Sequence, residues 1–448
     1  MKHFTVSQAA AACQGRLSRA DYEDRELGRV VIDSRQVQPG DLFVAYRGEK
    51  VDGHDFISAA FEKGAACCLA ERVPEGETRL VLLTDDVQKA LERIAAAYRA
   101  TLDLPVVGVT GSVGKTSAKE MIAAVLAQRF SVLKTEGNLN NQIGVPMTVS
   151  RIEPEHEIAV VELGISGFGE MTELARIARP RIAVFTRIGH AHLEMLGDLD
   201  GVFRAKTELL PFLPGDGVVV VNGDDPYLRA LRCPQRRITV GLAPENELRA
   251  EEIHSLGEER TDCTLVWEGR RIPVTIPAYG RHLVYAALEG AAVGFALGLS
   301  DEEVAAGIAA FHTVGRRGAV VETGFLILVD DSYNANPDSI ECGIDSLLQL
   351  PGRHVAILGD MRELGDGGAE MHRQVGRYAR EKGVDLLLAS GPLGAGFAEG
   401  AGDIARYFPE RAALIAALPE LLRKGDAVLV KASLRMGFAE VAEAVKRL

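Results

Sequence analysis

The chain has 448 residues, which predicts two or three domains, and with 47% hydrophobic and 25% charged residues its composition is that of an ordinary globular protein. Its formal net charge of −13 argues against a nucleic-acid-binding protein, which usually carries a basic surface. The N-terminus lacks the apolar core of a signal peptide, and no long apolar run predicts membrane insertion. The six cysteines are scattered, so reduced cytoplasmic thiols are expected rather than disulfides or a zinc site.

Residues 1–103 have a mixed pattern that predicts a first α/β domain. Turn signals stand at Pro39-Gly40 and Asp52-Gly53, and residues 87–100 follow a helical pattern.

From residue 105 the sequence alternates between strand and helix patterns. Continuous β-branched runs at 105–110, 158–163, 181–186 and 217–222 predict a parallel sheet that is buried on both faces. Residues 238–278 alternate instead and turn at Glu268-Gly269, which indicates an antiparallel excursion. A helix is expected over 283–297.

A second strand-and-helix series starts near Gly315. Its strands are expected at 325–331, 354–360, 385–390 and 427–433. The predicted fold is therefore α/β with three domains, over residues 1–103, 104–314 and 315–448.

The stretch PVVGVTGSVGKTSAKEM, residues 105–121, reads as strand, phosphate-binding turn and helix. The strict Walker pattern requires glycine where Val109 stands, but the local glycines still let backbone N–H groups approach phosphates at a helix N-terminus. Lys115 can reach terminal phosphates, and Thr116 offers a hydroxyl to Mg²⁺. The alternative is a glycine-rich turn with an incidental Lys-Thr pair. The predicted nucleotide-binding residues of this turn are Gly111, Ser112, Val113, Gly114, Lys115, Thr116 and Ser117.

Four further residues are candidates whose chemistry the sequence alone leaves open. Glu162 ends a strand, where parallel sheets bind ligands, although a capping or solvated glutamate gives the same pattern. His190 and His192 follow the next strand and read equally as polar loop histidines. Lys206 reads by spacing as a lysine on a helix surface.

Several motifs together resemble the ATP-dependent Mur ligases of peptidoglycan synthesis. The phosphate turn is followed by TEGNLNNQIGVPMTV (135–149), and DSRQVQPGDLFVAYRGEKVDGHDF (33–56) is similar to the first domain of two members of this family. VDDSYNANPDSI (329–340) and ILGDMRELG (357–365) resemble the member that adds the terminal dipeptide. The resemblance covers nearly the whole chain, in the correct order.

The resemblance implies a three-domain ligase: a uridine-nucleotide domain, a central ATPase domain and a Rossmann-like lid. The implied reaction joins D-Ala-D-Ala to UDP-MurNAc-tripeptide through an acyl phosphate, with ATP converted to ADP and phosphate. ATP and two magnesium ions are the expected cofactors. A cytoplasmic monomer without nucleic-acid or membrane partners is expected.

The resemblance also assigns site residues. Lys115, Glu162, His192 and Lys206 are the implied catalytic residues. Glu162, Thr116 and His192 are implied at the metal site, with Glu194 beside His192, and carbamylated Lys206 would hold the second ion. The implied ATP contacts outside the turn are Arg316, in a register that the adjacent Arg317 leaves open, and Asp331, Tyr333, Asn334 and Asn336. The implied substrate contacts are Ser34, Arg35, Gly48, Asn138 and Asn141.

Two segments depart from the family pattern. Leu283 and Ala286 stand where it has asparagines near adenine, and Ala432 and Leu434 stand in a Lys-Gly-Ser-Arg pattern, where Arg435 substitutes only if the backbone shifts. These departures keep a catalytically weak relative that binds UDP-muramoyl precursors open as an alternative. The others are the tripeptide-forming Mur ligase, a folylpolyglutamate-type synthetase and a P-loop switch ATPase.

Overall fold

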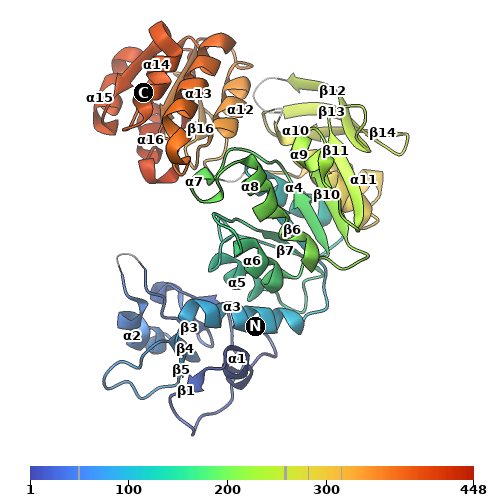
Figure 1. Ribbon diagram of the computed structural model, residues 1–448, viewed down its shortest axis with the longest axis vertical. Helices are drawn as coiled ribbons and strands as arrows, with labels where there is room; N and C mark the ends of the chain where they lie inside the picture. The colour runs from blue at the N-terminus through green and yellow to red at the C-terminus, as the bar shows by residue number, and fades with distance from the viewer. Residues whose placement is uncertain (49–50, 257–259, 281, 314) are drawn as a thin grey trace.

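The computed structural model describes residues 1–48, 51–256, 260–280, 282–313 and 315–448, and arranges them around three sheets (Figure 1). Each sheet lies within one of the three ranges expected from the sequence. Glu49 and Lys50 of the first-domain motif, Arg281 and Val314 lie outside the described residues, as do residues 257–259 of the expected antiparallel excursion.

The first sheet runs in the order β1-β5-β4-β3-β2, with β1 antiparallel to β5 and the other neighbours parallel. Helices α1 and α3 cover one face and α2 the other. The helix expected at 87–100 is confirmed as α3. The bounds are α1 (Val6–Cys13), α2 (Ile57–Glu62), α3 (Val87–Ala100), β1 (Arg16–Leu17), β2 (Val30–Val31), β3 (Leu42–Val44), β4 (Cys67–Ala70) and β5 (Val81–Leu83), with 3-10 turns η1 (Ser34–Gln36) and η2 (Gly53–Phe56).

The second sheet runs β14-β13-β12-β11-β10-β9-β6-β8-β7. Its neighbours from β7 through to β12 are parallel, and β13 and β14 continue it in antiparallel pairing. The antiparallel excursion predicted over 238–278 is therefore confirmed for β13 and β14, whereas β11, at its start, pairs in parallel with both neighbours. Glu268 and Gly269 form the tight turn with φ of 50° and 80°. The strands are β6 (Val106–Thr110), β7 (Val132–Lys134), β8 (Ile158–Glu162), β9 (Ile182–Phe185), β10 (Val218–Asn222), β11 (Arg236–Gly241), β12 (Leu248–Leu256), β13 (Arg260–Trp267) and β14 (Arg270–Ile276).

Helices cover both faces of this sheet, as its continuous apolar strands require. On one face α4 and α10 lie so close that a Cβ on Gly290 would stand 3.0 Å from Met121 Cγ. The other face packs against α5, α6 and α8. The bounds are α4 (Lys115–Leu126), α5 (Gly144–Val149), α6 (Glu170–Ala178), α7 (Leu193–Leu196), α8 (Leu199–Thr207), η3 (Leu210–Phe212), α9 (Pro226–Ala230), α10 (His282–Ala296) and α11 (Asp301–Ala309).

The third sheet runs β15-β16-β20-β17-β18-β19, with β15 antiparallel and the rest parallel. Helices α12 and α13 pack on one face, and α15 and α16 on the other. The bounds are β15 (Ala319–Glu322), β16 (Ile327–Asp331), α12 (Pro337–Leu347), β17 (His354–Gly359), η4 (Gly365–Gly367), α13 (Gly368–Lys382), β18 (Leu386–Ser390), α14 (Gly394–Ala401), η5 (Gly402–Ile404), β19 (Ala405–Phe408), α15 (Arg411–Leu421), β20 (Ala427–Lys431), η6 (Leu434–Met436) and α16 (Ala439–Lys446). Across the described ranges, no helix is both long and apolar enough to cross a membrane.

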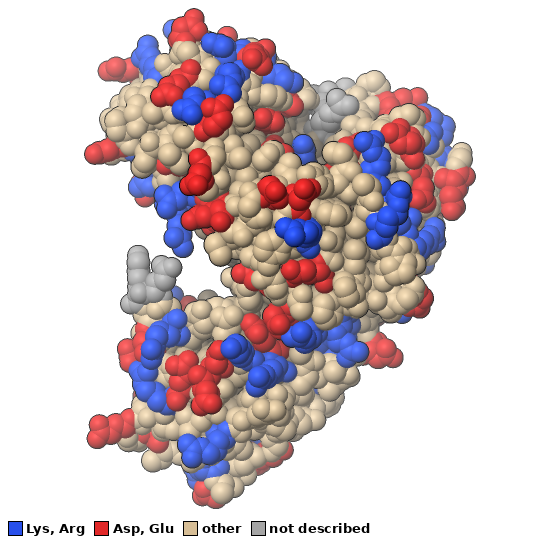
Figure 2. All heavy atoms as spheres, viewed as in Figure 1, with Lys and Arg blue, Asp and Glu red and all other residues tan. Residues whose placement is uncertain are grey.

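The first sheet and its helices form one end of the molecule, and a hollow separates them from the third sheet on the face that Figure 2 shows. Helix α3 joins this end to the second sheet through a buried arginine. Arg99 donates from Nε to the carbonyl of Ala178 at 3.0 Å, and from Nη1 and Nη2 to those of Leu102 and Leu104 at 2.8 and 2.9 Å. One guanidinium therefore fixes the segment that links α3 to β6.

Replacing Arg99 with alanine is expected to lower the free energy of unfolding by about 2–3 kcal/mol, because three carbonyls would lose their donor inside the protein. Urea denaturation measures this as a lower midpoint, and limited proteolysis should show faster cleavage between residues 101 and 105. Arg93→Ala removes an exposed arginine from the same helix and should change stability by less than about 0.5 kcal/mol. Equal midpoints for the two variants would contradict the role given to Arg99.

Candidate functional site

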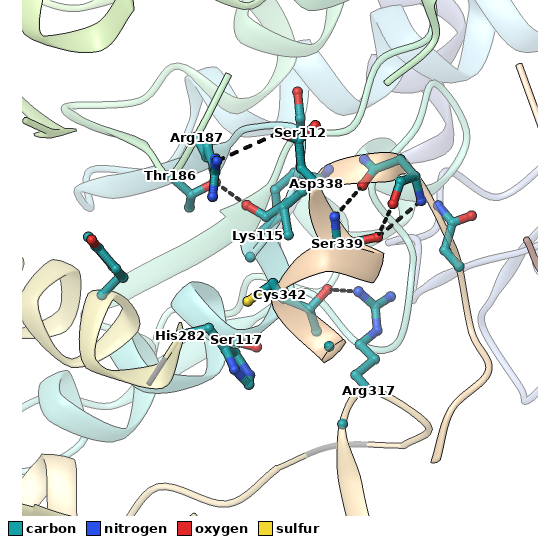
Figure 3. A pocket seen from close by; sticks show the side chains of 18 of the residues that line it. Ser112, Lys115, Ser117, Thr186, Arg187, His282, Arg317, Asp338, Ser339 and Cys342 are labelled. Carbon is teal, nitrogen blue, oxygen red and sulfur yellow. Dashed lines mark hydrogen bonds and ion pairs between the residues drawn. The ribbon is translucent and has the colours of Figure 1, made fainter. Parts of the chain in front are cut away.

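A cavity of about 1200 Å³ lies between the second and third sheets, at the carboxyl ends of their parallel strands. This is the edge at which open α/β sheets bind ligands. Figure 3 shows Lys115 and Thr186 of the second sheet region facing Asp338, Ser339 and Cys342 of α12. The residues from the phosphate turn that line it are Ser112, Val113, Gly114, Lys115, Thr116 and Ser117.

The phosphate turn follows β6 and opens α4, as the sequence predicts. Gly111 and Gly114 have φ of 153° and 87°, and a Cβ on Gly111 would stand 1.9 Å from Thr186 Oγ1, so this position requires glycine. Lys115 Nζ donates to the Gly111 carbonyl at 2.7 Å, which folds the lysine back over the turn. The turn therefore presents backbone N–H groups and an ammonium at a helix N-terminus, which suits a phosphate.

Glu162 is buried at the end of β8, with its carboxylate held by neighbours on two sides. The Thr116 hydroxyl donates to Oε2 at 2.9 Å, and Asn140 Nδ2 donates to Oε1 at 2.8 Å. Lys119 Nζ lies 3.9 Å from Oε2 and is itself fully buried. The sequence analysis missed Lys119 because its place inside α4 reads as a helix-surface lysine.

Lys115 lies near this carboxylate and near Arg317, and Lys206 lies near Lys115. Burial lowers the pKa of Lys115, and nearby Arg317 lowers it further while Glu162 opposes both effects. Lys206, on α8, is 1% exposed, and burial together with the charge of Lys115 lowers its pKa well below the usual value. Within the described ranges, the Lys206 amine has neither a hydrogen-bond nor an ion-pair partner. Burial therefore opposes the charged form of both lysines, and an anionic ligand next to Lys115 would favour its charged form.

The structure brings Arg317, rather than the predicted Arg316, into the cavity. The Arg317 guanidinium lies 4.0 Å from the centre of the Tyr333 ring, and its Nη1 donates to Thr116 Oγ1. Arg316 is exposed and does not belong to the described lining. Spacing alone could not choose between two adjacent arginines, because the backbone after residue 314 decides which one turns inward.

The predicted histidines lie where the second and third sheets meet. His192 lines the cavity, has a left-handed φ of 55°, and places Nδ1 2.5 Å from Glu363 Oε2. His190 Nδ1 lies 3.0 Å from Asp338 Oδ2, and this bond raises the pKa of His190. Glu194 contacts the same loop through its backbone N–H, which donates to the Glu363 carbonyl. Both histidines therefore join the central domain to the third sheet.

The predicted residues of the third sheet region face the turn from across the cavity. Asp331, Tyr333, Asn334 and Asn336 all line it. Lys431 lies 2.5 Å from Asp331 Oδ2 and donates to the Asn334 carbonyl at 2.8 Å, so a buried lysine orients this loop. Asn336 caps α12 by accepting a hydrogen bond from Ser339 N at 2.8 Å.

The predicted substrate contacts fall into two groups. Asn138 and Asn141 line the cavity, and Asn141 Oδ1 also accepts from Gly144 N at the start of α5. The described lining does not include Ser34, Arg35 or Gly48, which belong to the first domain. Arg35 is paired there with Asp33, Nη2 to Oδ2, at 2.8 Å.

Three family models match successive parts of the chain. The Mur ligase family catalytic domain matches residues 26–100, the Mur ligase middle domain residues 109–294, and the Mur ligase glutamate ligase domain residues 316–434. The UDP-N-acetylmuramoyl-tripeptide–D-alanyl-D-alanine ligase of Bacillus subtilis is 37% identical, over 98% of this chain and 97% of its own.

The chain belongs to the Mur ligase family.

Solved structures agree with this assignment along the whole Mur ligase chain. A crystal structure of MurF from Acinetobacter baumannii has a TM-score of 0.91 at 29% identity and covers 99% of both chains. MurF from Thermotoga maritima, crystallised in complex with ADP, has a TM-score of 0.83 at 29% identity and covers 94% of this chain and 97% of its own. The three-domain α/β fold and the ATP-dependent amide ligase class follow from these matches.

The four departures from the family pattern occupy different environments in this Mur ligase. Leu283 is 2% exposed and packs in the core between α10 and the second sheet, whereas Ala286 lines the cavity. Ala432 is buried against the third sheet, and Leu434 is 55% exposed. Arg435 is exposed and its charge acts on Glu363, so it lies near the His192 contact. Only the change at Ala286 therefore alters the wall of the cavity.

The side-chain oxygens of Thr116 and Glu162 suit a magnesium ion better than the histidine nitrogens of this Mur ligase do. Thr116 and Glu162 place a hydroxyl and a carboxylate oxygen 2.9 Å apart beside the phosphate turn, and Mg²⁺ is usually held by one or two carboxylates plus substrate phosphates. Among the described residues, no cluster of three His, Cys, Asp or Glu side chains forms a complete protein-only metal site. A magnesium ion here would depend on the nucleotide for the rest of its ligands.

Arg317→Ala is expected to weaken ATP binding about 30-fold, because it removes a cation that the cavity holds against the phosphate turn. Isothermal titration with ATP and Mg²⁺ measures the change. Arg316→Ala is the matched control and should keep the affinity within about twofold, since its guanidinium is exposed. A larger loss in Arg316→Ala than in Arg317→Ala would reverse the assignment.

Proposed function

We propose that this Mur ligase joins D-Ala-D-Ala to UDP-MurNAc-tripeptide, converting ATP to ADP and phosphate and giving UDP-MurNAc-pentapeptide. The observation that carries the proposal is the single cavity that holds the phosphate turn, Glu162 and the loop 331–336 together. The relatives that match the full length, from 31% to 37% identity, are named for this reaction.

The chemistry requires a good leaving group on the carboxylate of the tripeptide. A carboxylate oxygen attacks the γ-phosphorus of ATP, the bond from that phosphorus to the bridging oxygen breaks, and ADP leaves. The amine of D-Ala-D-Ala then attacks the acyl carbon of the acyl phosphate, phosphate departs, and the nitrogen loses a proton to form the amide. Both steps gather negative charge, so preorganised donors lower their barriers.

The cations beside the phosphate turn suit the first step. Lys115 and the backbone N–H groups of the turn bind the terminal phosphates, and Arg317 approaches the same point from the other side of the cavity. Asp331 and Asn336 present polar groups to the nucleotide from the third domain. Contacts between this domain and the centre, such as His192 with Glu363, would help to exclude water from the acyl phosphate.

The magnesium site is part of the proposal. Glu162 and Thr116 would hold one ion, which supplies charge neutralisation at the phosphates when bound. The second ion needs an anion where Lys206 stands. Its buried amine, with a lowered pKa and no described partner, is suited to attack carbon dioxide: an N–C bond forms, a proton leaves, and the product is a carbamate anion. His192 would lie at the edge of this site and face it with the ring nitrogen that does not contact Glu363.

The remaining assignments concern the acceptor substrate. Ser34, Arg35 and Gly48 would bind the uridine diphosphate in residues 1–103, where the Arg35 fork suits a diphosphate. Asn138 and Asn141 would contact the peptide or phosphates between this domain and the centre, residues 104–314, with residues 315–448 as the lid. A cytoplasmic monomer remains our expectation.

The weak precursor-binding relative is the second candidate, and the loss of a polar side chain at Ala286 is the observation that favours it. The tripeptide-forming ligase, the folylpolyglutamate-type synthetase and a switch ATPase do not account for the sequence DDSYNANPDS in the lid. A substrate panel separates these possibilities.

The test of the function is phosphate release with ATP and Mg²⁺, combined with mass detection of the uridine product. Phosphate and pentapeptide should appear together, and only when both UDP-MurNAc-tripeptide and D-Ala-D-Ala are present. Lys115→Ala should reduce both by at least about 1000-fold, because the turn loses its phosphate-binding cation. Precursor binding without turnover would favour the weak relative, and full activity of Lys115→Ala would defeat the ATP-site assignment.

Lys206→Ala should be inactive and partly rescued by acetate, because a small carboxylate can replace the missing carbamate. Carbon NMR with labelled bicarbonate should show a carbamate signal in the wild type and none in the variant. Arg204→Ala, which removes an exposed cation from the same helix, is the control and should keep activity. An unimpaired Lys206→Ala would remove Lys206 from the metal site.

A further inference from the structure

One face of α10 forms a wall of the cavity. His282, Tyr285, Ala286 and Glu289 all line it, at positions i, i+3, i+4 and i+7 of the helix. Leu283 and Ala287 point away from this face and pack in the core. The cavity therefore extends along α10 for two turns, between this helix and the ends of β10 and β11.

Glu289 is an acid that the proposed mechanism does not use. It is 2% exposed, and its Oε1 is buried without a hydrogen-bond partner among the described residues. Burial raises the pKa of Glu289 to about 8, so at neutral pH the side chain is mainly a neutral carboxylic acid. In this form it offers one O–H donor and one carbonyl acceptor. A buried polar group left unpaired is costly, which points to a partner that arrives with a ligand.

The other acids near this wall are already satisfied. Asp224 accepts hydrogen bonds from Leu242 N, Ala243 N and the hydroxyl of Tyr285, at distances of 2.6 to 3.1 Å. Asp225 accepts from Leu228 N and Ile188 N. These carboxylates hold the ends of β10 and β11 in place, and Glu289 is left to meet a ligand.

The order of the strands indicates which part of a nucleotide reaches this wall. The phosphate turn follows β6, and β9 and β10 lie next on one side, so the end of β10 lies about 10 Å from the turn. On the other side β8 carries Glu162, which accepts a hydrogen bond from Asn140 of the loop before α5. Ile143 and Met147, after that loop, pack against the first-domain core. A nucleotide held at the turn by its terminal phosphates therefore extends its base toward β10, β11 and α10.

Ala286 leaves the room that the Glu289 side chain needs. Side chains on a helix lean toward its N-terminus, so Glu289 reaches back over the turn on which Ala286 lies. Because residue 286 is small, the carboxyl group of Glu289 can lie over the part of the wall that a polar side chain at position 286 would otherwise cover. Leu283 has no part in this, because it faces the core.

We infer that the Glu289 carboxyl group recognises the purine of the bound nucleotide, donating to a ring nitrogen and accepting from the exocyclic amine. Adenine presents this pair at N7 and N6, which side-chain amides bind in the same bidentate way. The inference rests on the proposed function only in requiring that ATP binds at the phosphate turn. Glu289 is thus a specificity-determining residue for adenine.

Isothermal titration of the full chain with ADP and with purine riboside diphosphate, which lacks the exocyclic amine, tests this inference. The wild type should prefer ADP about 10-fold, and Glu289→Leu should lose about 10-fold in ADP affinity together with the preference. Glu289→Gln keeps a donor and an acceptor and should bind ADP within about threefold of the wild type. Glu302→Gln makes the same change at an exposed position and should have no effect.

Two results would overturn the inference. Equal binding of the two nucleotides by the wild type would do so without any variant, even if Glu289→Leu failed to fold. An unchanged preference for ADP in a folded Glu289→Leu would do so as well. A wild type that binds neither nucleotide would refute the ATP site itself, which distinguishes failure of the proposed function from failure of the role of Glu289.

Discussion

The site of this chain depends on lysines that are buried next to the phosphate turn. Glu162 and Arg317 lie near Lys115, Lys206 lies near Lys115, and burial disfavours the charged form of both lysines. The apolar packing of the parallel sheet offsets the cost of burying these lysines. The phosphate turn, Glu162 and the histidine loop all lie at the ends of strands that are packed on both faces. A phosphate bound at the turn would stabilise the charged form of Lys115.

Side chains of the site also hold the third domain against the central domain. Three contacts join the central domain to the third domain or to the segment leading into it: His192 with Glu363, His190 with Asp338, and Arg317 with Thr116. The buried Tyr279 hydroxyl also donates to the Ser346 carbonyl at 2.8 Å, and one cluster of buried apolar residues contains members of both domains, among them Leu193 and Leu364. The third domain therefore packs against the central domain through both polar and apolar contacts around the cavity.

The sequence predicted the buried parts of the fold well because they carry long apolar runs. The strands at 158–162 and 182–185 and the helix at 87–100 lie close to their expected bounds. The missed strands β7, β15 and β19 are short, and their side chains are only partly buried, so no continuous apolar run marks them. The first-domain strands β1 to β5 were missed as well, because each is only two to four residues long even where it is buried.

The site was predictable only where a motif fixes the position of a residue along the chain. The glycines, Lys115 and Thr116 are set by their place between a strand and a helix, and the structure puts all of them at one point. Lys119 and Lys431 were not singled out, and the choice between Arg316 and Arg317 stayed open, because inward orientation depends on tertiary packing that spacing does not encode. Lys119 and Lys431 are among the most deeply buried charges in the described chain, although each reads as an ordinary lysine at the level of the sequence.

Ala286 and Glu289 show how a departure from a motif and a buried, neutral acid can explain each other. Taken alone, the missing amide suggests weak binding of adenine, and the unpaired acid of Glu289 suggests a defect in the core. The structure places both on one face of α10, one turn apart, in the wall of the same cavity. Side chains on a helix lean toward its N-terminus. A longer polar side chain one turn further along can therefore present its hydrogen-bonding group at the same part of the cavity wall. The polar function can then survive although the residue that usually provides it is gone, and a motif defined by fixed positions would record only the loss.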